Sequence, residues 1–256
     1  MLQANRDAAA SASRPDQTSS RDGPNRCSSC SLHKMCLPTG LDESDMQRLD
    51  GIMVRRRVPK DGILYSMGES FRSLYAIRVG HFKTYQLACN GQEHISAFQM
   101  TGDLLGMDAI STDQHHCYAV ALEDSEVCEI PFTRLQGLFS DIPPLLRHFH
   151  RTMSQEIMRE QSAMFLLGNM SAEQRFSAFL VNLSLRYKAR GYSSTNYQLR
   201  MSREDIGKYL GLTIESVSRL LSKFRAISWI SVDRREVTLL DLPALKLHAM
   251  QNTEEH

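Results

Sequence analysis

The apolar pattern of this chain changes after about residue 131, and that change most restricts its fold. Between residues 54 and 131, short apolar runs alternate with glycines at intervals of roughly 8–12 residues, which is typical of a small antiparallel barrel or sandwich. The clearest runs are 63–65, 74–77, 95–98 and 118–122. Asn90-Gly91 suits a hairpin turn, because both residues tolerate a positive φ angle.

A long helix is predicted from Pro143-Pro144, since proline is favoured in a first helical turn. Its apolar residues step by three and four, which is typical of a two-helix coiled coil and predicts a homodimer. Packing of the helix on its own β domain is the alternative. The predicted dimer seam consists of Met153, Ile157, Glu160 and Met164.

The C-terminal region reads as two short helices followed by a hairpin. Ser202 and Thr213 are predicted N-caps, and Gly211 supplies the tight turn between the two helices. Residues 229–240 alternate around a polar turn and predict the hairpin. The expected fold class is therefore α+β: an antiparallel β-roll, a long dimerisation helix and a winged helix-turn-helix.

The net charge of +1 does not by itself indicate nucleic acid, but residues 175–235 hold 12 Lys/Arg and 4 Asp/Glu. Glu215, Ser218 and Arg219 share one face of the second helix and are predicted to read bases. An exposed ion pair between Glu215 and Arg219 is the alternative. The predicted phosphate contacts are Arg203, Lys208, Thr213, Ser216, Lys223 and Arg225.

The cysteines point to metal or redox chemistry. Cys27, Cys30 and Cys36 lie in one short segment with the spacing C-x2-C-x5-C, and soft thiolates select zinc, copper(I) or iron–sulfur clusters. Spacing alone leaves zinc as a competitor. A fourth ligand must come from elsewhere, and the spacing does not choose among Cys89, Cys117 and Cys128.

The expected organisation follows from these patterns. We expect no secretory signal, no membrane span and a cytoplasmic protein, because the chain has no long apolar stretch. The expected parts are a disordered leader (1–26), a cluster-binding cysteine loop (27–40), a β-roll sensor domain (41–140), a dimerisation helix (141–169) and a winged helix-turn-helix domain (170–250).

Several segments resemble the CRP/FNR superfamily of transcription regulators. The segment 205–221, DIGKYLGLTIESVSRLL, is similar to the helix-turn-helix of that family, and its E-x-x-S-R pattern resembles the FNR branch. Ile214 stands where the cyclic-AMP receptor branch has an arginine. The resemblance extends through SLYAIRVG (73–80), GDLLGMDAI (102–110) and VCEIPF (127–132), and so covers nearly everything after residue 25.

The resemblance implies a cofactor. FNR-type regulators hold a [4Fe-4S] cluster with three N-terminal cysteines of this spacing and one cysteine in a V-C-E-I-P-F segment. Carried over, the ligands are Cys27, Cys30, Cys36 and Cys128, which leaves Cys89 as a surface thiol and Cys117 as a packing residue. No cyclic nucleotide is expected, because the Arg-Ser pair that would hold its phosphate is missing from 106–118.

The resemblance also implies a function. In such regulators the intact cluster favours a dimer that binds a TTGA-N-TCAA-type palindrome, acts with RNA polymerase and controls anaerobic gene expression. A regulator of the same fold with a thiol, zinc or small-ligand input is the alternative. An iron–sulfur enzyme or a purely architectural DNA binder fits less well, because neither explains both the cysteines and the helix-turn-helix. We further hypothesise that Glu160, on the predicted seam, holds the cluster-free protein below its dimerisation threshold.

Overall fold

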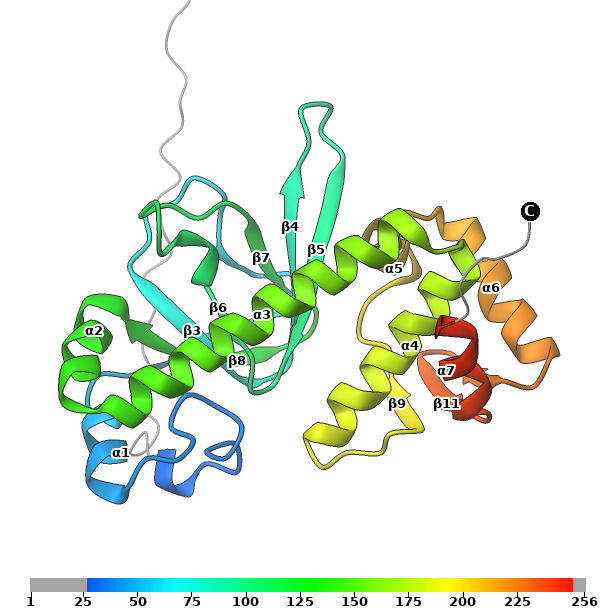
Figure 1. Cartoon of the computed structure of the whole chain (residues 1–256). Helices are drawn as coiled ribbons and strands as arrows, with labels where there is room; N and C mark the ends of the chain where they lie inside the picture. Colours follow the sequence, from blue (N-terminus) through cyan, green and yellow to red (C-terminus); the bar gives the residue numbers. More distant parts are fainter. Residues whose placement is uncertain (1–26, 251–256) are drawn as a thin grey trace, which may run out of the picture.

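The structure, a computed structural model, describes residues 27–250 of the 256-residue chain. The predicted leader, 1–26, lies outside the described residues. Figure 1 shows an N-terminal β-roll and a C-terminal, mainly helical domain, with one long helix running along both. None of the helices within 27–250 is long and apolar enough to cross a membrane.

Two four-stranded antiparallel sheets form the β-roll, as predicted. One has the order β1-β8-β3-β6 and the other β2-β7-β4-β5. Their facing sides enclose a core that includes Tyr65, Ile77 and Phe82. The strands are β1 (Val54–Val58), β2 (Ile63–Tyr65), β3 (Ser73–Val79), β4 (His81–Leu87), β5 (Glu93–Met100), β6 (Leu104–Leu105), β7 (Tyr118–Ala121) and β8 (Ser125–Pro131).

A helical layer covers the outer face of the β1-β8-β3-β6 sheet. Leu49, Leu145 and Phe149 are buried there against Leu74 and Ile130 of the strands. The cysteine segment and the start of the long helix belong to this layer (Figure 1). The helices are η1 (Cys27–Ser29), α1 (Glu43–Asp50), η2 (Met107–Ala109), α2 (Phe132–Asp141) and α3 (Pro143–Asn169).

The C-terminal domain has the predicted winged helix-turn-helix arrangement. Ser202 caps α5 in a capping box with Asp205, and Gly211 adopts the left-handed conformation at its end, with φ 64°. Its third strand, β9, pairs with β11 and was not predicted. The elements are α4 (Ala172–Ala189), β9 (Asn196–Gln198), α5 (Arg203–Leu210), α6 (Ile214–Ala226), β10 (Ile230–Asp233), β11 (Glu236–Leu239) and α7 (Leu242–Met250).

The two domains share one apolar core and one buried ionic cluster. Ile95 and Phe98 of β5 pack in the same cluster as Phe179 of α4. The Asp103 carboxylate, in the turn between β5 and β6, accepts from Arg186 at 2.5 Å and from Arg190 at 2.6 Å. Burial opposes ionisation of Asp103, but Arg186, Arg190 and Arg159 together lower its pKa, so the carboxylate stays charged. This cluster ties the β-roll to α4.

Candidate cluster site and DNA interface

One cavity brings together four cysteines from two distant parts of the chain. Cys27, Cys30 and Cys36 come from the segment before α1, and Cys128 comes from the central strand β8. The remaining lining residues are Leu32, His33, Pro38, Met53, Ala76, Ile77 and Arg78. Cys89 is exposed and Cys117 is buried inside the β-roll, so neither of these two thiols lines the cavity.

Local hydrogen bonds and two buried leucines shape the cysteine loop. The backbone N–H of Cys27 donates to both carboxylate oxygens of Asp50 in α1, at 2.8 and 3.0 Å. The hydroxyl of Thr39 donates to the carbonyl of Cys36 at 2.7 Å. Leu32 and Leu37 are buried beneath the loop. The sequence shows no regular apolar pattern in this segment, because the two leucines are not spaced as a regular helix or strand would space them, yet both are buried.

The thiols lie in a desolvated environment. Burial is the largest of the causes that raise the pKa of Cys36 to about 12 and that of Cys128 to about 11, and neighbouring cysteines contribute a smaller part of each shift. Burial, followed by the Asp50 carboxylate, also raises the pKa of Cys27. The free thiols of Cys27, Cys36 and Cys128 are therefore protonated at neutral pH, and a metal must displace these protons to bind.

The donor set fits an iron–sulfur cluster. All four converging ligands are soft sulfur atoms, and their surroundings are mainly apolar. Within 27–250, no group of three or more His, Cys, Asp or Glu side chains is placed to hold a metal ion, so the four thiols converge on the cavity without a preformed ion site. A second sign of fit is Arg78, which lines the cavity and has a buried Nε atom without a hydrogen-bond partner among the described residues.

The cysteine loop contacts the long helix α3. Cys27, Cys36 and Cys128 pack against the apolar cluster that contains Leu145 and Phe149 of α3. Burial and Arg151 lower the pKa of His148, while a hydrogen bond from its ring to the Cys36 backbone opposes them. The position of the loop and that of α3 are therefore coupled.

The predicted dimer seam divides into two parts. Met153 packs partly against the core of its own β-roll, whereas Ile157 and Met164 are 53% and 73% exposed. Glu160 between them is also exposed. The neighbouring Arg159 pairs with Glu156 and Asp103 instead. The first half of this helix therefore packs on the β-roll, which was the alternative, and its second half presents an uncovered apolar stripe. The two-helix coiled coil stays a prediction.

Sequence reasoning missed two members of this stripe. Met158 and Phe165 are 63% and 58% exposed on α3. They lie about 100° and 80° around the helix from Ile157, so they widen the exposed apolar face rather than extend the narrow seam. The sequence did carry a signal for them, because apolar residues at 158 and 165 lie beside the three-and-four steps and make the apolar face wider than a strict coiled-coil seam.

The predicted base-reading residues lie on one exposed side of α6. Val217, Leu221 and Phe224 are buried, while Glu215 and Arg219 are exposed. The Thr213 side chain caps the helix by accepting from the Ser216 backbone at 3.2 Å. Gly207 of α5 permits this packing, because a Cβ there would lie 2.6 Å from the carbonyl oxygen of Leu212.

The charged groups on this face are available for DNA. A hydrogen bond from its own backbone N–H and then one from the Thr213 hydroxyl lower the pKa of Glu215, so its carboxylate is an acceptor at neutral pH. Arg219 donates to the Ser216 hydroxyl at 3.1 Å and Arg203 donates to the Ser218 hydroxyl at 3.3 Å. Such neutral partners are easily exchanged for bases or phosphates.

Two predicted phosphate contacts have other partners. Lys208 lies 2.8 Å from Glu93 of β5 and from Glu204, so it links α5 to the β4–β5 hairpin. Lys223 pairs with Glu173 of α4 at the surface. The Lys208 assignment is therefore corrected to a contact between domains, whereas the half-exposed Lys223 ammonium can exchange its carboxylate for a phosphate.

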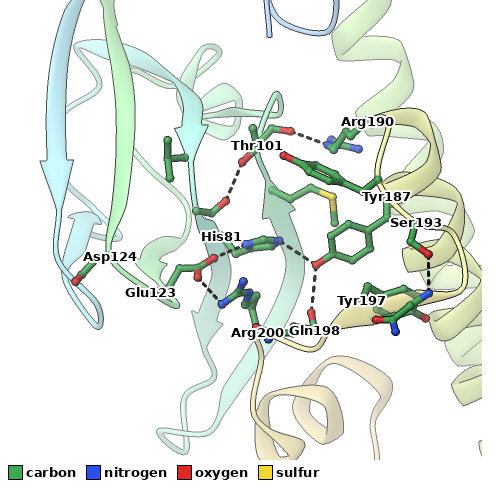
Figure 2. A pocket seen from close by; sticks show the side chains of 15 residues that line it. His81, Thr101, Glu123, Asp124, Tyr187, Arg190, Ser193, Tyr197, Gln198 and Arg200 are labelled. Carbon is green, nitrogen blue, oxygen red and sulfur yellow. Dashed lines mark hydrogen bonds and ion pairs between the residues drawn. The ribbon is translucent and has the colours of Figure 1, made fainter. Parts of the chain in front are cut away.

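A larger cavity, of about 420 Å³, lies where the β-roll meets the C-terminal domain (Figure 2). Several of its labelled polar groups pair with one another. His81 Nδ1 lies 2.6 Å from Glu123, which also pairs with Arg200 at 2.9 Å. The hydroxyl of Tyr187 lies 3.2 Å from His81 Nε2, and Arg190 donates to the Thr101 carbonyl. These contacts join the domains.

Comparisons with known proteins agree with this architecture. A Crp-like helix-turn-helix domain model matches residues 174–247, and a cyclic nucleotide-binding domain model matches residues 55–141. The chain is 44% identical over 220 residues to the anaerobic regulatory protein of Pasteurella multocida, covering 86% of this chain and 81% of that one.

Two further matches cover most of the chain. The fumarate and nitrate reduction regulatory protein of Vibrio cholerae is 44% identical over 216 residues, which are 84% of this chain and 86% of that protein. The solved structure of FixK2 from Bradyrhizobium japonicum superimposes with a TM-score of 0.73 at 27% identity, covering 79% of this chain and all of FixK2.

Proposed function

The chain belongs to the CRP/FNR family of transcription regulators, in its FNR branch, and from that premise we propose that it controls anaerobic gene expression through an oxygen-sensitive [4Fe-4S] cluster. The observation that carries the proposal is the convergence of Cys27, Cys30, Cys36 and Cys128 on one cavity. These four thiolates would hold the cluster. When bound, the cluster supplies a centre that oxygen can oxidise and dismantle.

The chain's own contacts suggest how the input reaches the DNA. The cysteine loop packs on the first half of α3, and α3 continues without a break to the exposed stripe around Ile157 and Met164. When its cysteines hold a cluster, the loop would be fixed in place. It would then fix the position of the first half of α3, and hence that of the exposed stripe. We assign this stripe to a homodimer, since two copies of α6 are needed to read the two halves of a palindrome.

The alternative inputs are less well supported. A thiol switch needs cysteines whose pKa is low, and here burial raises the pKa of Cys36 and Cys128. A cyclic nucleotide is not proposed, because Asp108, in the corresponding segment, already accepts from the His116 backbone and contacts His115. The Tyr65 ring stacks on His115, with the ring centroids 3.8 Å apart.

The proposed target is double-stranded DNA carrying a TTGA-N-TCAA-type palindrome, with RNA polymerase as the further partner. Glu215 would accept from cytosine N4, and Arg219 would donate to guanine O6 and N7 of the same base pair. Ser218 lies beside them on α6. Arg203, Thr213, Ser216 and Lys223 would contact phosphates, which position the helix without reading sequence.

Replacing Arg219 by alanine tests the DNA assignment. We expect a loss of about 1–3 kcal/mol in binding free energy and a relaxed preference at the G·C pair, because the guanidinium fork is lost. Binding of the anaerobic protein to half-sites that vary at this pair measures both effects.

Lys223→Ala is the matched control. It should weaken binding to all sequences equally and flatten the dependence on salt, since it removes a phosphate contact. A loss for Arg219→Ala that is uniform across the base variants would contradict the assignment.

A further inference from the structure

Arg78 is placed at the cysteine cavity by an irregularity in strand β3. The pairing of β3 with β8 runs from Ala76 opposite Cys128 to Ile77 opposite Val127, and then shifts so that Val79 lies opposite Glu126. At this shift Arg78 has no paired residue on β8. A bulge of this kind re-aims a side chain, and here the side chain lines the cavity of the four cysteines.

Only part of the Arg78 guanidinium has a hydrogen-bond partner. Its NH1 group donates to the Glu126 carboxylate at 2.7 Å, and this bond fixes the orientation of the planar group. Its Nε atom is buried and has no hydrogen-bond partner among residues 27–250. A buried N–H without an acceptor is destabilising, so its retention calls for an acceptor that binds in the cavity.

The charge around Cys128 is positive, whereas the Asp50 carboxylate lies beside Cys27. Arg55 lies directly opposite Cys128 on β1, on the other side of β8 from Arg78, and its Nε atom lies 3.9 Å from Glu126. Two guanidinium groups and one carboxylate thus surround Cys128. A [4Fe-4S] core with four thiolates carries a net negative charge, which becomes more negative on reduction, and this positive surrounding compensates it.

We propose that Arg78 is a positioning residue of the cluster site, whose Nε–H donates to a ligand sulfur or sulfide and whose charge raises the reduction potential of the cluster. This inference rests on the proposed function, because it requires that the four cysteines hold a cluster. Glu126 holds the plane of the Arg78 guanidinium so that its Nε atom faces the cavity.

The test is a redox titration of the anaerobically purified full chain, followed by EPR. Arg78→Gln should lower the equilibrium constant for taking up one electron about tenfold, which is 59 mV for a one-electron couple. Arg78→Lys should give an intermediate potential, since lysine keeps the charge but not the fixed Nε–H.

Arg56→Gln is the matched control. Arg56 is adjacent to Arg55 but pairs with Val127 and contacts Glu129, so it belongs to the opposite face of the sheet. This variant loses the same charge and should keep a potential close to that of the wild type. If Arg78→Gln assembles no cluster while its thermal unfolding matches the wild type, the positioning role is supported, and Arg78→Lys then reports the potential.

Two failures are distinguishable. A wild-type chain that holds no iron–sulfur cluster anaerobically overturns the proposed function and, with it, this inference. A wild-type chain that holds the cluster, with Arg78→Gln and Arg78→Lys at the potential of the wild type, overturns the role of Arg78 alone.

Discussion

Replacing Cys128 by serine should abolish anaerobic assembly of the cluster. A hydroxyl is a hard, weakly acidic donor and is a poor substitute for a thiolate on iron. Cys128 lies on the central strand β8, where pairing with β1 and β3 fixes its position, so no nearby cysteine can take its place. The same loss is expected for serine at Cys27, Cys30 or Cys36. Iron and sulfide content and the visible spectrum measure the outcome.

The remaining two cysteines provide matched controls for this substitution. Cys89 is exposed and Cys117 is buried in the core of the β-roll, away from the cavity. Serine at either position should leave the iron content unchanged. If Cys128→Ser retained full iron and Cys117→Ser lost it, the fourth ligand would be Cys117 and the proposed site would be wrong.

Replacing Glu160 by alanine should give a protein that dimerises and binds DNA in air, with or without a cluster. In a parallel dimer the two Glu160 carboxylates would approach one another across the seam between Ile157 and Met164, and burying like charges is costly. Arg159 is already held by Glu156 and Asp103, so it is not positioned to neutralise them. Removing the carboxylate removes this opposition to association.

Sedimentation of the aerobic variant tests the role of Glu160. Gln155→Ala is a suitable control, because residue 155 is exposed on the opposite side of α3 and gains the same helix propensity. It should sediment as the wild type does. A Glu160→Ala protein that stays monomeric in air, indistinguishable from the wild type, would show that Glu160 reaches solvent at the seam edge and does not set the threshold.

Local patterns were sufficient to predict the main elements. Proline at 143 and 144 marked the start of α3, Ser202 and Thr213 marked two helix starts, and Gly211 marked the turn between them. Each of these acts on the backbone within a few residues of itself, so its effect can be read from sequence. The glycine-separated apolar runs likewise corresponded to strands of the β-roll.

Pairings between distant segments could not be predicted in this way. Spacing left three candidates for the fourth cysteine, since only the pairing of β8 with β1 and β3 brings Cys128 next to the N-terminal loop. Lys208 looked like a phosphate contact because Glu93, 115 residues away, is not visible in its local sequence. The bulge that places Arg78 is a property of the register between two strands, which residue types alone do not fix.

The most direct test of the account is purification of the full chain without oxygen, with iron and sulfide assays and a visible spectrum, repeated after exposure to air. We expect one [4Fe-4S] cluster per chain, with a broad visible absorption that disappears in air together with binding to the TTGA-N-TCAA-type site. A colourless anaerobic protein that contains zinc or no metal, and that binds this site equally well before and after air, would contradict it.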